Sequence, residues 1–147
     1  MGAVATIIDK VNLHSMEQME SNQYWEVFET KVRYLTERQQ RIIAYKFCLL
    51  AENDLDDLAK RALRLVEQLT SGHVSLQDCE SYREQLQNQL PDEGTSVYSP
   101  LIWALTPHTD AYPAWYSAAI VGLNIVDLGT STFPELTDLT KGILDNF

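Results

Sequence analysis

The chain has 147 residues, with 11 lysines and arginines against 21 acidic residues, which gives a formal net charge of −10. Its hydrophobic share of 45% is typical of a globular protein and too high for a disordered one. A surface this acidic repels nucleic acid, so we expect no nucleic-acid partner. It favours an encounter with a basic protein instead.

The acidic charge is concentrated towards the end of the chain. Residues 31–64 carry eight basic and five acidic side chains, whereas residues 85–147 carry one base, Lys141, and seven acids. This distribution favours a basic partner for the second half of the chain. Because net charge constrains solubility more directly than function, acidity that serves solubility alone is the competing interpretation.

The sequence also indicates where the protein resides. Residues 1–13 lack the basic region and the sustained apolar core of a secretory signal. The longest apolar run, residues 111–126, is shorter than the roughly 20 residues that cross a membrane. Cys48 and Cys79 fall within helical patterns, where buried, reduced thiols are expected. We therefore expect a cytoplasmic protein with no membrane association.

Helix-capping patterns divide the chain into helices. A Ser or Thr followed three residues later by an acidic or amide side chain opens a helix. No run shows sustained apolar and polar alternation, so strands are not expected. The sequence predicts an all-α fold, a compact multi-helix domain of orthogonal or bundle type over residues 1–147, in which residues 1–14 form an arm or a short helix. The three capping patterns are Thr36 with Gln39, Ser75 with Asp78, and Thr132 with Glu135.

Three further helix starts are predicted from single polar residues. Asn53 or Asp54 is expected to cap a helix that runs to about Leu69. Ser99 is expected to cap a short helix, with Pro100 in its first turn. Asp110 is the expected N-cap of the helix that follows it.

The helix at residues 111–128 is the most informative element. It has no charged residue between Asp110 and Asp127, and Gly129 follows it. A helix that is apolar on nearly every side must be surrounded by other helices. We therefore expect it to be the buried central helix, with Ala118 and Ala119 fully enclosed.

Few patterns in the chain point to catalysis or metal binding. Its three histidines, His14, His73 and His108, are not paired with each other or with cysteine at the spacing of zinc ligands. No phosphate-binding glycine loop or nucleophile motif occurs. We therefore expect no catalytic residues, no metal and no cofactor.

One segment, residues 103–116, gathers aromatic side chains with a histidine and an acid. Its aromatic residues are candidates for core packing or for stacking on each other. They are equally the residue types that dominate protein-binding surfaces. A third interpretation is a ligand pocket in which His108 is a general base. The side chains concerned are Trp103, His108, Asp110, Tyr112, Trp115 and Tyr116.

A loop is predicted at residues 91–99, where proline, glycine and serine are close together. Its acids, Asp92 and Glu93, join Trp103, His108, Asp110 and Tyr112 as the predicted partner-binding residues. The acids would steer a basic partner, and the exposed aromatic side chains would anchor it.

Three arginines, Arg38, Arg41 and Arg64, lie on neighbouring predicted helices. Guanidinium groups bind phosphate or carboxylate well. Pairing with acids such as Glu26, Glu29 and Glu37 across the helix surface is the favoured interpretation, and a ligand role is the alternative.

The order of helices resembles that of the all-helical immunity proteins of bacterial polymorphic toxin systems. The matching parts are the helix Arg41–Leu50 with Phe47-Cys48 near its end, the amphipathic helix Asp54–Leu69, and the small-residue stretch Ala114–Ala119. The resemblance covers the layout of about residues 36–128. It implies a small cytoplasmic protein that blocks a partner toxin by binding it, and it carries over no catalytic residue.

Two classes of function remain. The first is a non-enzymatic acidic binding protein, an immunity or inhibitor protein aimed at a basic partner such as a toxin. The second is a small helical enzyme or ligand-binding domain that uses residues 103–116.

Overall fold

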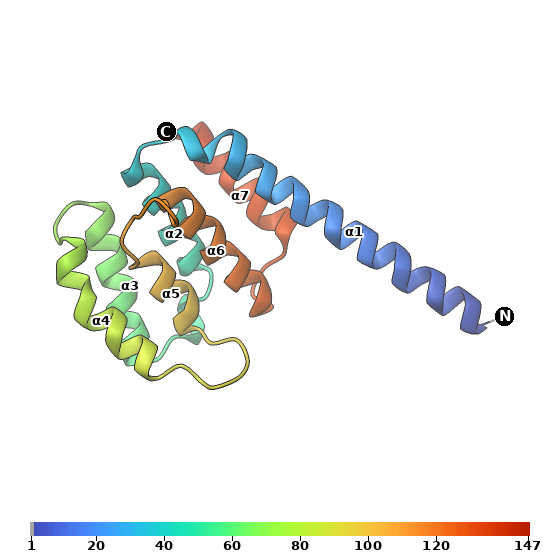
Figure 1. Ribbon diagram of the computed structural model, residues 1–147, viewed down its shortest axis with the longest axis horizontal. Coiled ribbons are helices and arrows are strands. Elements are labelled where there is room, and N and C mark those ends of the chain that lie inside the picture. The colour runs from blue at the N-terminus through green and yellow to red at the C-terminus, as the bar shows by residue number, and fades with distance from the viewer. Residues whose placement is uncertain (1) are drawn as a thin grey trace.

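A computed structural model describes the backbone of residues 2–147 and the side chains of residues 15–147. Over residues 2–147 every regular element is helical (Figure 1), which confirms the all-α prediction. The α-helices are joined by short loops and by two 3-10 turns. The elements are α1 (Gly2–Thr30), η1 (Val32–Tyr34), α2 (Glu37–Leu49), η2 (Glu52–Asp54), α3 (Asp57–Thr70), α4 (Leu76–Asn88), α5 (Tyr98–Ala104), α6 (Ala114–Asp127) and α7 (Phe133–Asp145).

The first helix is longer than the sequence patterns predict. The backbone of residues 2–14 is not a short helix of its own but the beginning of α1, which has 29 residues. Its C-terminal part packs along α7, and its N-terminal part extends away from the other helices (Figure 1). Tyr24 and Phe28 lie in the packed part and are fully buried.

Helix α6 lies at the centre of the molecule, as predicted, in contact with α1, α2, α5 and α7. Ala118 and Ala119 are buried, at 1% and 0% exposure. Small side chains let α1 approach closely enough for the Tyr24 hydroxyl to donate to the Ala119 carbonyl, 2.6 Å away. A Cβ at Gly122 would overlap the same Tyr24 ring. The small residues of α6 therefore set its spacing from the neighbouring helices.

The three predicted two-residue capping patterns are confirmed. Thr36 and Ser75 each form a reciprocal capping box with the side chain three residues later. Thr132 accepts from the amide of Glu135 at the start of α7. These bonds satisfy donors that the first turn of a helix leaves without partners.

The single-residue cap predicted for α3 was wrong. Asn53 and Asp54 belong to η2, and the N-cap of α3 is Asp56, whose carboxylate accepts from the amide of Ala59 at 2.9 Å. Asp56 also receives the hydroxyl of Tyr98, a contact from α5 that favours this later start.

The cap predicted for α5 was also wrong. Ser99 lies within α5, which begins at Tyr98, and the hydroxyl of Ser96 accepts the Tyr98 amide at 3.1 Å. The acceptor therefore lies three residues before Ser99.

Both cysteines are buried and free, as predicted. Burial raises the pKa of the Cys48 thiol to about 12. Burial, followed by the charge of Asp78, raises the pKa of Cys79. Within residues 2–147, every helix is too short or too polar to cross a membrane.

Candidate functional site

Five aromatic side chains form a continuous series of ring contacts, which we call the aromatic surface. The centroids of Trp103 and Tyr112 lie 5.7 Å apart, and those of Tyr112 and Tyr116 lie 5.9 Å apart. Tyr116 also contacts Trp25, at 5.9 Å, and Trp115, at 6.0 Å. The five residues come from α1, α5, α6 and the α5–α6 loop, so the fold brings together aromatic residues that are far apart in sequence.

The aromatic surface is open to solvent at Tyr112, which is 47% exposed, while its other four members are partly buried. Arg33 and Tyr34 of η1 border the aromatic surface beside Trp115, and Arg33 gives this edge a positive charge. The Arg33 guanidinium carbon lies 5.9 Å from the ring centroids of both Tyr34 and Trp115. Tyr34 is 77% exposed. Trp, Tyr and Arg are the residue types that most often anchor protein partners.

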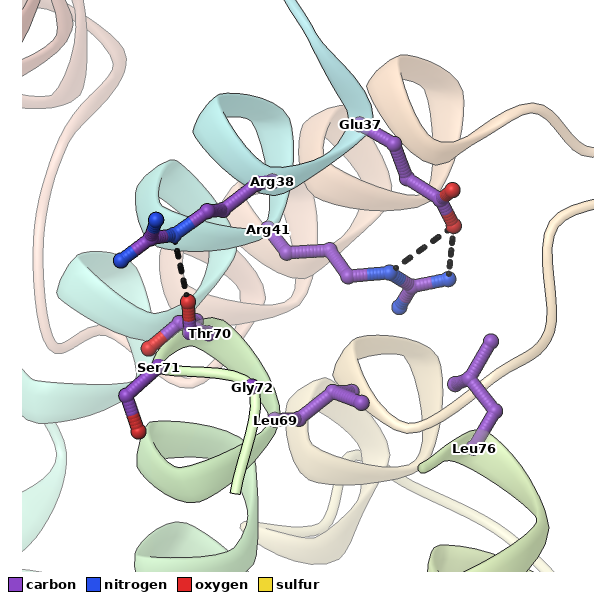
Figure 2. A pocket seen from close by; sticks show the side chains of 8 residues that line it. All are labelled: Glu37, Arg38, Arg41, Leu69, Thr70, Ser71, Gly72 and Leu76. Atoms are coloured by element: carbon purple, nitrogen blue, oxygen red, sulfur yellow. Dashed lines mark hydrogen bonds and ion pairs between the residues drawn. The ribbon is translucent and has the colours of Figure 1, made fainter. Parts of the chain in front are cut away.

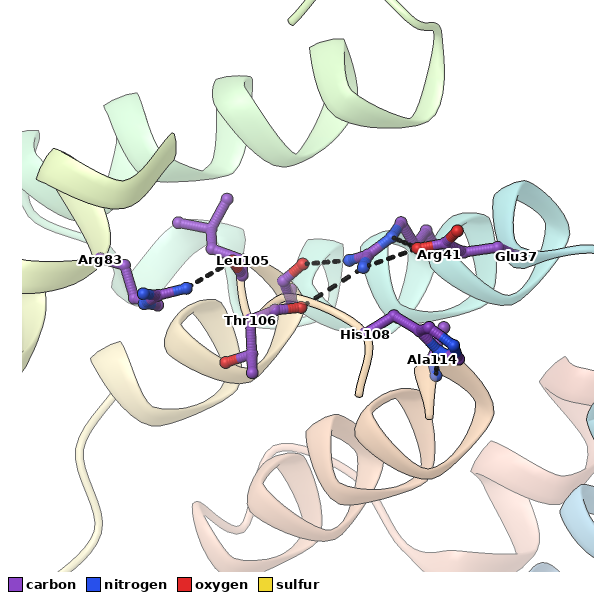
Figure 3. Close-up of polar contacts among 8 residues, drawn as sticks. Glu37, Arg41, Arg83, Leu105, Thr106, His108 and Ala114 are labelled. Atoms are coloured by element: carbon purple, nitrogen blue, oxygen red, sulfur yellow. Dashed lines mark hydrogen bonds and ion pairs between the residues drawn. The ribbon is translucent and has the colours of Figure 1, made fainter. Parts of the chain in front are cut away.

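The loop between α5 and α6 places Tyr112 within the aromatic surface. The amide of Thr109 donates to the Tyr112 carbonyl at 3.1 Å, and the Tyr112 amide donates to the Thr109 hydroxyl at 2.9 Å. The predicted N-cap role of Asp110 was wrong, because Pro113 is the N-cap of α6 and makes no side-chain capping bond. The amide of Ala114 donates instead to Nδ1 of His108, at 3.2 Å (Figure 3).

A buried arginine on α2 holds the beginning of this loop. Arg41 is only 8% exposed and pairs with Glu37, at 3.0 Å. Its guanidinium also donates to the carbonyls of Ala104 and Thr106, at 3.3 Å each (Figure 3). The predicted pairing with an acid is confirmed for Arg41 and Glu37, whereas Arg38 and Arg64 form no ion pair among the described side chains. The carbonyl bonds show that Arg41 also anchors the end of α5.

Arg83 of α4 approaches the same place, where its guanidinium donates to the Leu105 carbonyl at 3.5 Å. The carbonyls at the end of an α-helix lack amide partners and carry partial negative charge. Two cations from α2 and α4 therefore converge on the C-terminus of α5. They stabilise the loop that carries His108, Asp110 and Tyr112.

The acids of the preceding loop lie apart from the aromatic surface. Asp92 and Glu93 are exposed on the loop between α4 and α5, while Asp110 is exposed on the loop after α5. Figure 1 shows these two loops at opposite ends of α5. Helix α5 has seven residues, which span about 10 Å. The fold thus brings Trp103 and Tyr112 together, with His108 and Asp110 on the same loop, and leaves Asp92 and Glu93 at the far end of α5.

A cavity of about 360 Å³ lies between α2 and the α3–α4 turn (Figure 2). Nε of Arg38 donates to the Thr70 carbonyl at the end of α3, at 2.8 Å, and Arg41 donates to the carbonyls of Ala104 and Thr106. Both arginines therefore serve to join helices. The cavity is lined by Glu37, Arg38, Arg41, Leu69, Thr70, Ser71, Gly72 and Leu76.

Sequence reasoning missed three contributors to the site, namely Trp25, Arg33 and Tyr34. They lie about 70 to 80 residues before the predicted segment. Trp25 follows Tyr24 within a helical apolar pattern, which gives no sign that its ring meets Tyr116. The contact depends on how α1 crosses α6, which local sequence does not encode.

Comparison with known proteins gives no match to any family model, curated protein or solved structure. Among the side chains of residues 15–147, no three histidine, cysteine or acidic groups are placed to hold a metal ion. Five cavities of the described part are lined by residues outside 103–116. The aromatic side chains line none of these five cavities.

Proposed function

We propose that this protein is a non-enzymatic binding protein that blocks a basic partner protein, as an immunity or inhibitor protein blocks a toxin. The observation that carries the proposal is the aromatic surface. Its rings contact one another from Trp103 to Trp25 and reach solvent at Tyr112. Rings that are already packed against each other lose little side-chain freedom when a partner covers them, so they suit a binding hot spot.

The charge of the chain supports a basic partner. Asp92, Glu93 and Asp110 are exposed, and among the described side chains the pair between Arg41 and Glu37 is the only salt bridge. The three exposed carboxylates are therefore available to attract cations. Electrostatic attraction extends over about 10 Å at 0.1 M salt, so Asp92 and Glu93 can speed association without touching the aromatic anchors.

The two sides of the aromatic surface differ in charge, which supports a single docking orientation. Trp103 lies on α5, whose preceding loop carries Asp92 and Glu93. Trp115 lies under the Arg33 guanidinium, which makes no hydrogen bond or ion pair with a described side chain. A partner that is basic at the α5 side and carries a carboxylate opposite Arg33 complements this arrangement.

Site-specific photo-crosslinking in cells of the native host tests the proposal. A benzophenone amino acid in place of Tyr112 is expected to capture one basic protein. The same amino acid in place of Tyr82, a partly exposed tyrosine on α4, is the matched control and is expected not to capture it. Purified partner should then bind the wild-type chain and be inhibited by it.

Equal capture from both positions would contradict the proposal, and so would capture of no protein at all. Copurification of a small ligand whose binding is lost on substitution of Trp103 or His108 would favour the enzyme or ligand-binding alternative.

A further inference from the structure

The start of α6 depends on a histidine. Pro113 supplies no capping side chain, and the first turn of α6 contains no acidic residue. The acceptor for the Ala114 amide is Nδ1 of His108, at 3.2 Å. A ring nitrogen accepts a hydrogen bond only when it carries no proton. This contact therefore requires neutral His108 with its proton on Nε2.

Protonation of His108 would remove the acceptor and place a positive charge at a helix N-terminus, where the helix dipole is also positive. The charged groups around the loop do not reverse this effect. On α2, Glu37 and Arg41 neutralise each other in an ion pair at 3.0 Å. On α4, Arg83 binds the loop at Leu105. Asp110, in the same loop, is exposed, and so is His108 itself.

We propose that His108 makes the aromatic surface pH-sensitive: the neutral imidazole ties residues 108–113 of the α5–α6 loop to the first turn of α6, and the imidazolium cannot. Imidazole is the side chain whose charge ordinarily changes between about pH 5 and 8. The loop carries Tyr112, four residues after His108, whose ring contacts both Trp103 and Tyr116. Arg41 and Arg83 still hold the beginning of the loop, so loss of the His108 bond loosens the segment between His108 and Ala114, which carries the exposed anchor. Only the consequence for partner binding rests on the function proposed above.

Amide exchange of the full-length chain, followed by NMR at about pH 7.5 and 5.5, tests the structural step without a partner. In the wild type, the protection of the Ala114 amide, corrected for intrinsic exchange, should fall about five-fold on acidification, the change that follows loss of a helix cap. His108→Asn places an uncharged acceptor near the position of Nδ1 and should remain protected at both pH values. His108→Ala should have low protection at both.

His73→Asn is the control for other titrating groups, because His73 bonds with Ser71 in the α3–α4 turn. This variant should respond to pH as the wild type does. Unchanged Ala114 protection in the wild type, or an equal fall in the wild type and His108→Asn, would overturn the proposal.

Once a partner is purified, its affinity should weaken at the lower pH for the wild type more than for His108→Asn. The two proposals fail differently. If Ala114 protection changes and no partner exists, the proposed function fails while the switch stands. If a partner binds and Ala114 protection does not change, the switch is wrong.

Discussion

Two groups of aromatic rings in this protein, which meet where Tyr24 and Trp25 lie 5.9 Å apart, have similar spacing and different exposure. In the buried aromatic cluster of Tyr24, Phe28 and Phe47, the first two ring centroids lie 4.9 Å apart and every member is 0% exposed. In the aromatic surface, Tyr112 and Tyr116 lie 5.9 Å apart, and Tyr112 is 47% exposed. Ring contact alone therefore does not distinguish a core from a binding site.

The two groups differ in what holds them and in how their hydroxyls are used. The buried aromatic cluster comes from α1 and α2, and the Tyr24 hydroxyl donates to the Ala119 carbonyl. Burial raises the pKa of Tyr24 well above its ordinary value. Tyr112 lies on a loop and its hydroxyl bonds to no described residue. Substitutions in the first group should act on stability, and substitutions in the second should act on binding.

The substitution with the largest expected effect disturbs the buried aromatic cluster. An alanine Cβ at Gly122 would overlap the Tyr24 hydroxyl and lie 2.9 Å from Cε2 of Phe47. Gly122→Ala should lower the free energy of unfolding by about 3 kcal/mol, because it overpacks the core and disturbs the Tyr24 hydrogen bond. Denaturant unfolding measures the change.

Gly142→Ala is the matched control, since a Cβ there meets nothing within 4 Å. Gly142 lies inside α7, where alanine is the better helix former by about 1 kcal/mol. This variant should therefore be more stable than the wild type. Equal effects of the two substitutions would show that α6 is less tightly packed than described.

The next prediction tests the role of charge near the aromatic surface. Replacing Asp92 and Glu93 together by Asn and Gln should slow association with the partner about ten-fold at low salt and less at high salt. The dissociation rate should change little, because both residues lie at the far end of α5 from Tyr112. Stopped-flow mixing measures both rates. A change confined to dissociation would place the acids inside the interface.

The smallest expected effect concerns Tyr98, which belongs neither to the buried aromatic cluster nor to the aromatic surface. Tyr98 is 8% exposed, and its hydroxyl binds Asp56. That bond, followed by the Ala59 amide, lowers the pKa of Asp56. A carboxyl whose folded pKa is lowered stabilises the fold above its unfolded pKa of about 3.9 and loses that contribution as pH falls through the folded value.

Asp56→Asn should therefore be less stable than the wild type at neutral pH, and the difference should shrink below about pH 4. Because Asp56 is exposed, solvent screening keeps the effect small. Thermal unfolding as a function of pH tests this. A stability difference that is independent of pH would mean that Asp56 stabilises α3 only as a hydrogen-bond acceptor, with no contribution from its negative charge.

The predictable parts of the fold depend on short-range chemistry. The boxes at Thr36 and Ser75 join residues three apart, and the buried α6 follows from its uncharged sequence. The membership of Trp103 and Tyr112 in one surface also followed from their closeness in the chain. Each of these features is determined by interactions within about fifteen residues.

The features that sequence could not predict depend on contacts across the fold. Arg41 binds the carbonyl of Ala104, 63 residues away, and such a carbonyl has no signature in the sequence. His108 replaced Asp110 at the start of α6 because the path of the loop brings its ring to Ala114. Trp25 belongs to the aromatic surface because α1 crosses α6 where Trp25 can contact Tyr116.

The most direct test of the central claim compares stability with binding in Tyr112→Ala. Because Tyr112 is half exposed and its side chain makes no hydrogen bond in the described structure, the free energy of unfolding should change by less than about 0.5 kcal/mol. Affinity for the purified partner, measured by calorimetry, should fall by about 2 kcal/mol, as expected for a hot-spot residue. Unchanged affinity, or a loss of stability as large as the loss of affinity, would contradict the account.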